Sequence, residues 1–259
     1  CKSPQQMFGS LAREVLPEQL SVANEDLVSV SIMPCTAKKF EAQRSEFIHD
    51  GVPEVDFVLT TQELAHMIDE AGLKFNKLQP ESLDLPLGFK TGAGVIFGVT
   101  GGVTEAVLRL AAEKLGGVKL EAVDFHEVRG LEGLREAEVT VNGQTIRLAL
   151  VNGLANARRV AEQVKAGESR YDLIEVMACP GGCIGGAGQP VSFEHDVRQR
   201  RAAGLYEADK TLQLHKAQEN PYVQEAYQTT LGEVGGHKAH ALLHTGYHSR
   251  RRIQDEDVD

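Results

Sequence analysis

The sequence predicts an α/β protein in which largely parallel, twisted sheets are flanked by helices in two lobes, with one β-hairpin and a helical C-terminal region. Segments rich in β-branched residues alternate along the chain with segments whose apolar residues have helical spacing. Most strand-like segments outside the hairpin are largely apolar, which is typical of strands buried on both faces. Asn142 and Gly143 separate two alternating runs, and this dipeptide is a strong hairpin signal.

The first part of the chain is expected to contain two strands and two helices. Ser3 is a suitable N-cap and Pro4 suits the first helical position, so a helix should begin here. The β-branched run that ends at Met33 predicts a strand, and Gly72 is a suitable stop for the second helix. The predicted elements are a helix at 3–16, strands at 27–33 and 55–61, a helix at 61–72 and a loop at 76–90.

The second part of the chain begins with a glycine loop that leads into a helix. Val103, Val107, Leu110 and Ala111 share one face of that helix. The loop lacks the glycine spacing of a dinucleotide-binding fingerprint, so we do not expect a nucleotide site there. The predicted elements are the loop and helix at 91–117, the hairpin at 135–153, a helix at 156–167, a strand at 171–179 and helices through 194–248.

Length and charge limit the classes of function. The 259 residues carry a net charge of −10 and no long basic stripe, which argues against a nucleic-acid partner. No apolar run reaches the length of a membrane span, and the start of the chain has no export signal. We therefore expect a cytoplasmic protein without a membrane partner.

The two ends of the sequence carry two further expectations. The chain opens on Cys1 without an initiator methionine, which indicates a fragment of a larger domain over 1–259. The acidic tail at 250–259 is expected to be disordered.

The cysteines are the main candidates for chemistry. Cys35 follows the strand that ends at Met33, Cys179 follows the strand through Met177, and Cys183 lies one glycine turn further on. Thiolates gathered at strand ends can bind a soft metal or an iron–sulfur cluster. Isolated buried cysteines are the simplest alternative, and a zinc site is another, although the short paired knuckles typical of zinc are missing.

Six stretches of the sequence match known signatures jointly. They are "KSPQQMFG" (2–9), "MPCTAKKFEA" (33–42), "TGAGVIFGVTGGVTEA" (91–106), "VRGLEGLREAEV" (128–139), "EVMACPGGCIGGAGQP" (175–190) and "HALLH" (240–244). Together they resemble the catalytic domain of the iron-iron (FeFe) hydrogenases over nearly the whole chain. The resemblance implies reversible reduction of protons to H2 at an H-cluster, a 4Fe-4S cubane joined through one cysteine sulfur to a two-iron unit with CO, cyanide and dithiolate ligands.

The resemblance also implies roles for individual residues. Cys35, Cys179 and Cys183 would bind the cubane, and Cys183 would also be shared with the two-iron unit. Lys38 would be the catalytic-site lysine that donates a hydrogen bond to a cyanide ligand. The remaining implied pocket residues are Pro4, Gln5, Met33, Phe97, Val103 and Met177. Without the resemblance, Pro4 and Gln5 would be read as helix capping and the two methionines as core packing.

Part of the family pattern is missing from the sequence. The family's fourth cubane ligand and its proton-transfer cysteine lie in a "TSCCP" signature, which does not occur here. Cys1 lies in a segment where the family has no ligand, so we do not assign it to the cluster. The fragment alone is therefore expected to be inactive. Further 4Fe-4S or 2Fe-2S clusters in an upstream region, ferredoxin, or flavin subunits linked to NADH would supply electrons.

Two other functions remain open from the sequence. A sensory relative would bind the cluster but turn over slowly, and Ala187, where glycine is the more usual residue, leaves this open. A hydrogenase-like iron–sulfur assembly protein would make no hydrogen, although the complete motif with Lys38 argues against it.

A second group of possible metal ligands occurs near the C-terminus. His240 and His244 have the spacing of a metal pair, and His237 and His248 fall near the same helical face. We expect a half-exposed helix face here rather than a metal site.

Overall fold

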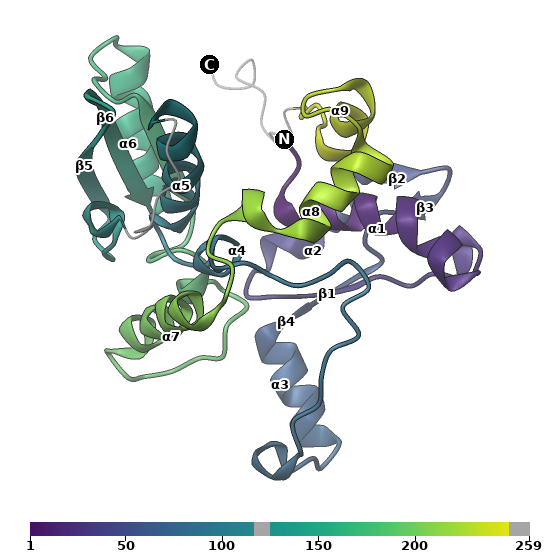
Figure 1. Cartoon of the computed structure of the whole chain (residues 1–259). Coiled ribbons are helices and arrows are strands. Elements are labelled where there is room, and N and C mark those ends of the chain that lie inside the picture. The colour runs from purple at the N-terminus through teal and green to yellow at the C-terminus, as the bar shows by residue number, and fades with distance from the viewer. Residues whose placement is uncertain (117–124, 249–259) are drawn as a thin grey trace, which may run out of the picture. The chain divides into compact units, whose positions relative to one another are not determined.

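The computed structural model describes residues 1–116 and 125–248 and confirms the α/β class (Figure 1). The chain forms two compact units. The described residues of the first unit are 1–31, 38–58 and 227–248, and those of the second are 32–37, 59–116 and 125–226. The predicted disordered tail at 250–259 lies outside the described residues.

The first unit is built mainly from helices. Ser3 caps the first helix by accepting a hydrogen bond from the Gln6 amide at 3.4 Å, and Pro4 occupies the first helical position as predicted. The helix continues beyond the predicted end to Leu20, where Ser21 stops it with a left-handed φ of 55°. The elements are α1 (Pro4–Leu20), α2 (Ala37–Ala42), α9 (His237–Leu243), the π-helix Tyr227–Leu231 and the antiparallel pair β2 (Ile48–His49) and β3 (Val52–Pro53).

The strands β1 (Val30–Met33) and β4 (Phe57–Thr60) form a two-stranded sheet. Both strands were predicted, and both are shorter than their apolar runs. In β1 alternate residues are exposed, so the expectation of burial on both faces is wrong for this strand among the described residues. Val30 and Ile32 share one face of the strand, and the described chain does not cover that face.

The second unit contains the other regular elements. They are α3 (Thr61–Glu70), α4 (Gly92–Ile96), α5 (Gly102–Gly116), β5 (Leu134–Val141), β6 (Gln144–Asn152), α6 (Leu154–Lys165), β7 (Leu173–Met177), α7 (Val197–Thr211) and α8 (Pro221–Ala226). The predicted helical region at 194–248 is confirmed, but it is divided into α7, α8, the π-helix and α9.

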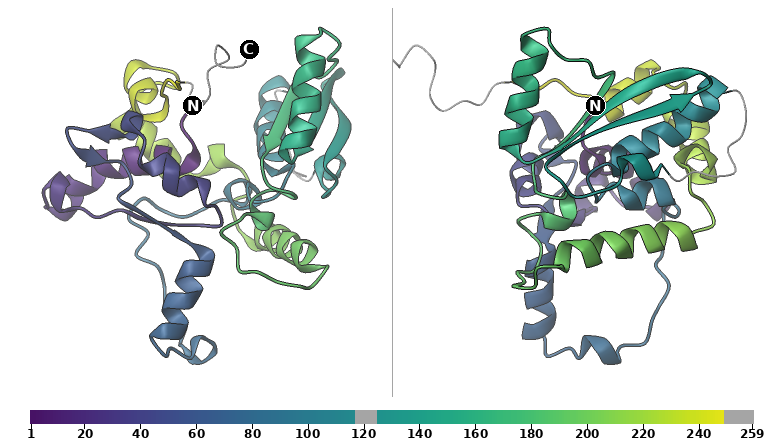
Figure 2. Two further views of the ribbon diagram at one scale, coloured as in Figure 1. Left: turned by 180° about the vertical axis from the view of Figure 1, so that it is seen from behind. Right: turned by 90° about the vertical axis from the view of Figure 1, so that its left-hand side faces the viewer.

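One sheet in the order β5-β6-β7 forms the core of the second unit (Figure 2). The predicted hairpin is confirmed: β5 and β6 are antiparallel, and Asn142 and Gly143 both have positive φ, at 49° and 78°. Strand β7 pairs with β6 in parallel. Residues Leu148 and Leu150 of β6 pack in one cluster with Leu108 of α5, whereas Ala149 and Val151 pack in another with Val160 of α6. The central strand is therefore buried on both faces, as predicted for a strand between two helix layers.

The sheets are small and of mixed direction, with β6–β7 parallel and two antiparallel hairpins. In α5 the apolar face named above is only partly covered, because Val107 and Leu110 are exposed. The helix buries Thr104, Leu108 and Ala112 instead.

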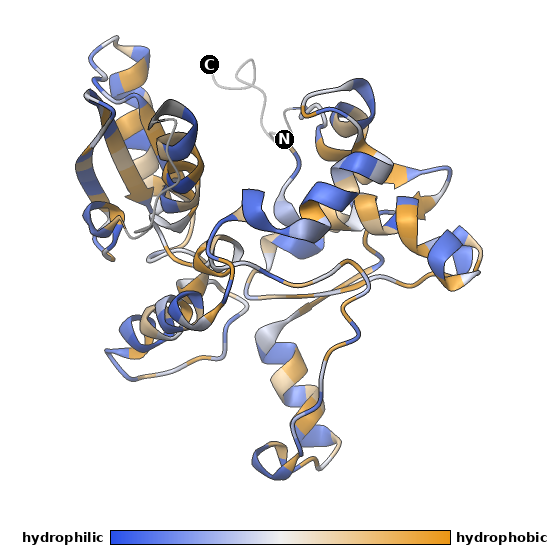
Figure 3. Cartoon of the chain, viewed as in Figure 1, coloured by the Kyte–Doolittle hydropathy of each residue, from blue (hydrophilic) through white to orange (hydrophobic). Residues whose placement is uncertain are grey.

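Helix α3 has short groups of apolar residues separated by polar residues along its length (Figure 3). No residue of this helix is buried by the described chain, and Met67 is 50% exposed. Exposed apolar positions on helices are often covered by a further part of a protein. Among residues 1–116 and 125–248, no helix combines the length and apolar character required to cross a membrane.

Candidate metal centre

The three predicted ligand cysteines lie in the second unit, each in a loop that follows a strand. Cys35 follows β1, and Cys179 and Cys183 follow β7. All three are half-buried, and none of the chain's four cysteines, which all lie in the described part, is in a disulfide. Half-buried thiols in rigidly held loops are suited to metal binding.

The loop of Cys35 and the loop of Cys183 are in direct backbone contact. The Gly188 amide donates to the carbonyl of Pro34 at 3.1 Å. A Cβ atom at Gly188 would lie only 2.8 Å from the amide nitrogen of Cys35, and one at Gly186 would collide with the Pro34 carbonyl. These glycines therefore permit a backbone approach that no other residue would allow. The two signature motifs are therefore in contact at this point of the second unit.

The turn between Cys179 and Cys183 is fixed by hydrogen bonds to two other segments. The Gly181 amide donates to the side-chain oxygen of Asn152 at 3.0 Å. The carbonyl of Gly181 accepts from Thr100 at 3.1 Å, and Ile184 donates to the Gly98 carbonyl at 3.0 Å. These bonds restrain the turn between the two cysteines relative to the segment 98–100.

A buried carboxylate connects β7 to the start of α5. Glu175 accepts from the amides of Gly101 at 2.5 Å and Thr104 at 2.8 Å, and from the Thr104 hydroxyl at 3.0 Å. An anion at a helix N-terminus satisfies unpaired amides and interacts favourably with the helix dipole. Glu175 thereby holds the first turn of α5, which includes Val103, against the strand that leads to Cys179.

A cavity of about 390 Å³ lies beside Cys183. Most of its lining is apolar, and its polar side chains are Gln189 and Arg201. The lining residues are Pro34, Val95, Gly98, Cys183, Ile184, Gln189, Arg201, Gly204 and Leu205, all from the second unit.

The other predicted pocket residues of this unit are also half-buried. Met33 ends β1 and Met177 ends β7, so each precedes a candidate cysteine by two positions. Phe97 and Val103 lie on either side of the Gly98–Gly102 turn that contacts the cysteine loop. Partial burial is compatible with the predicted role of these four side chains as an apolar wall.

Three predicted site residues lie in the first unit. Lys38 is 23% exposed, and its ammonium group lies 2.7 Å from one carboxylate oxygen of Glu41. The other oxygen of Glu41 accepts a hydrogen bond from the Ser3 hydroxyl. Pro4 is exposed. Gln5 is buried and accepts from the Ser31 hydroxyl at 2.9 Å, so its side chain does not cap the helix.

The three cysteines provide part of the donor set of an iron–sulfur cluster. Within residues 1–116 and 125–248, no three His, Cys, Asp or Glu side chains are grouped closely enough to hold one metal ion. A cubane separates its thiolate ligands more widely than a single ion does, and it requires four of them. Cys35, Cys179 and Cys183 provide three thiols in adjoining loops lined by glycine. They are suited to three corners of such a cluster.

The histidines near the C-terminus do not share one helix. Helix α9 ends at Leu243, so His244 is its cap and His248 lies beyond it. The rings of His240 and His244 are 4.5 Å apart between centroids, and His244 lies 3.4 Å from the sulfur of Cys1. Burial and the charge of His240 lower the pKa of His244, so the neutral imidazole is favoured.

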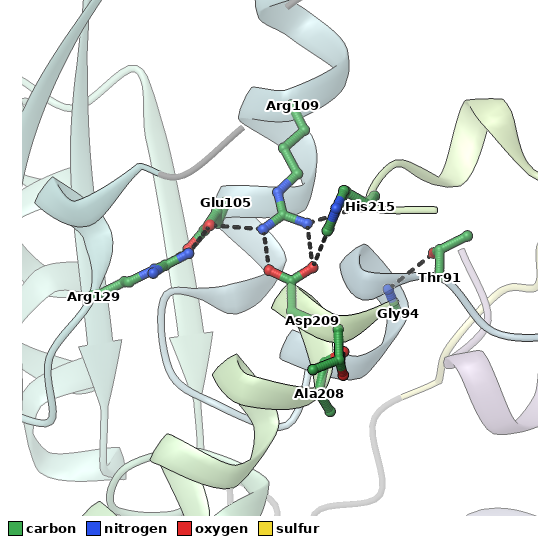
Figure 4. Close-up of polar contacts among 9 residues, drawn as sticks. Thr91, Gly94, Glu105, Arg109, Arg129, Ala208, Asp209 and His215 are labelled. Atoms are coloured by element: carbon green, nitrogen blue, oxygen red, sulfur yellow. Dashed lines mark hydrogen bonds and ion pairs between the residues drawn. The ribbon is translucent and has the colours of Figure 1, made fainter. Parts of the chain in front are cut away.

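A buried ionic network joins α5 and α7 in the second unit (Figure 4). The Arg109 guanidinium donates to both carboxylate oxygens of Asp209, at 3.0 Å and 2.6 Å, and to Glu105 at 2.9 Å. Arg129 also donates to Glu105, at 2.7 Å, and the ring of His215 lies 3.4 Å from Asp209. Burial opposes the charge on Asp209, but the hydrogen bond and charge of Arg109 outweigh it, so the pKa of Asp209 is lowered.

Several residues that fix the site were not predicted from the sequence. Glu175 is an acidic residue in an otherwise apolar strand, and Asn152 ends another such strand. A polar residue inside an apolar strand was the available signal, because such a residue must find buried partners. Arg201 belongs to a basic run that the sequence shows but does not assign to the site.

The fold and the cysteine loops define a mixed α/β domain of the hydrogenase type. The chain belongs to the iron-only hydrogenase family, since residues 1–187 match the family described as "Iron only hydrogenase large subunit, C-terminal domain". Residues 195–250 match a second family, "Iron hydrogenase small subunit".

Individual relatives agree with this assignment. The chain is 46% identical over 255 residues to a subunit of the NADP-reducing hydrogenase of Solidesulfovibrio fructosivorans, covering 97% of this chain and 43% of the relative. It is 41% identical to iron hydrogenase 1 of Clostridium pasteurianum, covering 95% and 44%. A solved [FeFe]-hydrogenase variant from Chlamydomonas reinhardtii matches with a TM-score of 0.80 and 40% identity, covering 95% of this chain and 69% of that chain. The chain spans about half the length of the curated relatives it matches.

The family also includes proteins with another role. The cytosolic iron-sulfur assembly component 3 of Rattus norvegicus is 32% identical over 260 residues, covering 97% of this chain and 54% of the relative. Identity to the assembly proteins is therefore lower than identity to the hydrogenases above.

Proposed function

We propose that this chain is the C-terminal part of the H-cluster domain of an enzyme that reduces protons to H2 reversibly. The observation that carries the proposal is the backbone contact between the two signature loops, in which Gly188 donates to Pro34 beside Cys35. That contact brings the cysteine of the first motif next to the loop that carries Cys183.

In this proposal Cys35, Cys179 and Cys183 hold the cubane, and Cys183 is shared with the two-iron unit. When bound, the H-cluster supplies the site where two protons and two electrons combine to form H2. The half-buried Met33, Phe97, Val103 and Met177 exclude water from it. Pro4 and Gln5 keep the cofactor-binding role that the resemblance implies for them.

The proposed role of Lys38 is to donate a hydrogen bond to an anionic ligand. Its ammonium group is partly covered and pairs with Glu41, so its position is restrained. A Lys38→Ala variant should lose the donor and impair cluster retention, because a buried anion without a partner is costly. Unchanged hydrogen evolution in that variant would remove the assigned role.

We further propose a cytoplasmic enzyme that receives electrons from upstream 4Fe-4S or 2Fe-2S clusters or ferredoxin. The relative named as an NADP-reducing hydrogenase subunit supports a link to a nicotinamide cofactor, and the proposed link passes through a flavin subunit. The match of residues 195–250 to a small-subunit family supports a multisubunit origin. A relative named as periplasmic, from Nitratidesulfovibrio vulgaris, makes localisation a separate question for experiment.

The decisive test uses the full-length protein, matured with the H-cluster and supplied with dithionite. We expect H2 evolution measurable by gas chromatography, together with infrared bands of CO and cyanide ligands. A protein that binds iron and sulfide but shows neither the bands nor H2 would contradict the proposal.

An iron–sulfur assembly role is the second candidate, because assembly proteins match 95–97% of the chain. A protein of that class would carry cubanes without CO or cyanide bands, so the same infrared spectrum separates the two functions. The sensory alternative rested on Ala187. That side chain is exposed, so alanine is compatible with the loop, and the turnover number decides between a sensor and a catalyst.

A further inference from the structure

Arg201 of α7 reaches the loop that carries Cys183. One guanidinium nitrogen donates to the carbonyl of Ile184 at 2.9 Å, and another donates to the carbonyl of Pro190 at 2.9 Å. Ile184 directly follows Cys183, and Arg201 and Cys183 line the same cavity. Two hydrogen bonds to the backbone hold a planar guanidinium in one orientation.

No carboxylate of the described residues pairs with the charge of Arg201. Within residues 1–116 and 125–248, Arg201 has only carbonyl partners and no carboxylate. Its neighbour Arg200 pairs with Glu194 and with Asp196, the latter at 3.2 Å, and Arg109 pairs with Asp209. A half-buried cation among carbonyl groups and apolar side chains is costly unless an anion lies nearby.

Under the proposed function the anion nearest Arg201 is the cubane, because Cys183, which lines the same cavity as Arg201, is one of its ligands. Thiolates bound to iron give a cubane negative charge, and uptake of an electron increases it. A fixed positive charge beside one of the thiolate ligands stabilises the reduced state more than the oxidised state, because it is attracted more strongly to the more negative form.

We propose that Arg201 is a positioning residue that holds a positive charge beside Cys183 and raises the reduction potential of the bound cubane. The inference rests on the proposed function. It also assigns the control of potential to α7, which lies in the segment that matches the small-subunit family. None of the three ligand cysteines lies in that segment.

The test measures the cubane's reduction potential in the matured full-length protein. The measured step is the uptake of one electron by the cubane from dithionite, followed by electron paramagnetic resonance. Arg201→Gln removes the charge and keeps a donor. We expect the ratio of reduced to oxidised cubane at a fixed potential to fall about tenfold, which is about 59 mV for one electron.

Two further variants provide the controls. Arg201→Lys keeps the charge and should remain near the wild-type potential. Arg200→Gln makes the same chemical change on the same helix, but this side chain is exposed and paired with carboxylates. It should therefore leave the potential unchanged, because solvent screens an exposed charge.

The outcomes separate this inference from the proposed function. If the wild-type protein assembles no cubane, the proposed function fails. If wild type and Arg201→Gln carry equal iron and have equal potentials, the inference fails and the function stands. A shift in Arg201→Lys as large as that in Arg201→Gln would also overturn it, because charge would not be the cause. If Arg201→Gln loses the cluster, Arg201→Lys must retain both the cluster and the potential for the inference to hold.

Discussion

Gly182 lies between the two cysteines of the loop and has a φ of 91°. A side chain there would meet backbone atoms on the facing loop, since a Cβ would lie 2.7 Å from the Thr100 amide nitrogen and 3.0 Å from the Gly98 carbonyl oxygen. Backbone atoms cannot rotate away as a flexible side chain can. The residue is therefore required both for its dihedral angle and for the close approach of the two loops.

We predict that Gly182→Ala lowers the melting temperature and reduces the iron bound per chain after maturation, because the clash must displace Cys183 or the 98–100 turn. Gly167→Ala is the matched control, since Gly167 also has a positive φ, 74°, but has open space around it. The control should cost about 1 kcal/mol from backbone strain alone and leave iron binding intact. Equal effects of the two substitutions would show that the clash contributes nothing.

The carboxylate of Asp209 makes stability depend on pH. Burial raises the pKa of Asp209, but Arg109 lowers it by more than burial raises it. The folded-state pKa therefore lies below the ordinary value of 3.8. The unfolded chain then binds a proton more readily as the pH falls, and the stabilisation present above pH 3.8 is lost below it. We predict that the difference in melting temperature between wild type and Asp209→Asn is large at pH 7 and shrinks towards pH 3. A difference that stays constant with pH would contradict the assignment.

At the scale of elements, the pair of Arg109 and Asp209 fastens α7 to α5. The two side chains are 0% and 2% exposed. Removing one partner of such a pair leaves the other charge buried without compensation, which costs more than the intact pair contributes. Within the described residues, Asp209 would retain the ring of His215 as its remaining side-chain partner.

We predict that Arg109→Met lowers the free energy of unfolding by about 3–5 kcal/mol. The comparison variant is Arg147→Met, because the pair of Arg147 with Asp172 is 48% and 46% exposed. Exposed pairs contribute about 0–1 kcal/mol. Urea denaturation followed by circular dichroism measures both changes. A loss below 1 kcal/mol in Arg109→Met would show that the network relaxes around the missing cation.

Local sequence signals predicted the elements that depend on local chemistry. Ser3 and Pro4 start α1 where expected, and the Asn142-Gly143 turn forms the hairpin. The sequence did not indicate which face of α5 is buried. Glu105 and Arg109 are polar by type but lie on the covered face, because Glu105 pairs with Arg129 and Arg109 pairs with Asp209, both outside α5. Hydrophobic periodicity cannot report partners that are distant in sequence.

The candidate site was predictable to a similar extent. The family resemblance selected the cysteine loops, and the contact of Gly188 with Pro34 supports bringing them together. The hydrogen bonds that hold these loops were not predictable from the sequence. Asn152, Glu175 and Arg201 bond to residues that are 29, 74 and 17 positions away in the sequence, respectively. These hydrogen bonds exist only after the sheet and α7 have packed.

At the scale of the whole molecule, one chain contains matches to two families, with a short segment between them. The large-subunit match ends at 187 and the small-subunit match begins at 195. Val191 and Phe193 in the intervening segment are 76% and 96% exposed. An extended, exposed segment of this kind tolerates a break in the chain, because few contacts depend on its continuity.

We predict that the second unit stays assembled when the chain is cut within this segment. Buried contacts cross the cut: Arg109 pairs with Asp209, Arg201 donates to the Ile184 carbonyl, and Ala202 packs in a cluster with Ile184. A specific protease site inserted between Phe193 and Glu194 of the full-length protein allows cleavage after folding. The two pieces should separate on a denaturing gel yet elute together in size-exclusion chromatography. Adding Arg109→Met should promote their separation after cleavage, because Asp209 on α7 then loses its buried cationic partner. Separate elution of the wild-type pieces would show that chain continuity, rather than these contacts, holds α7 against the loop of Cys183.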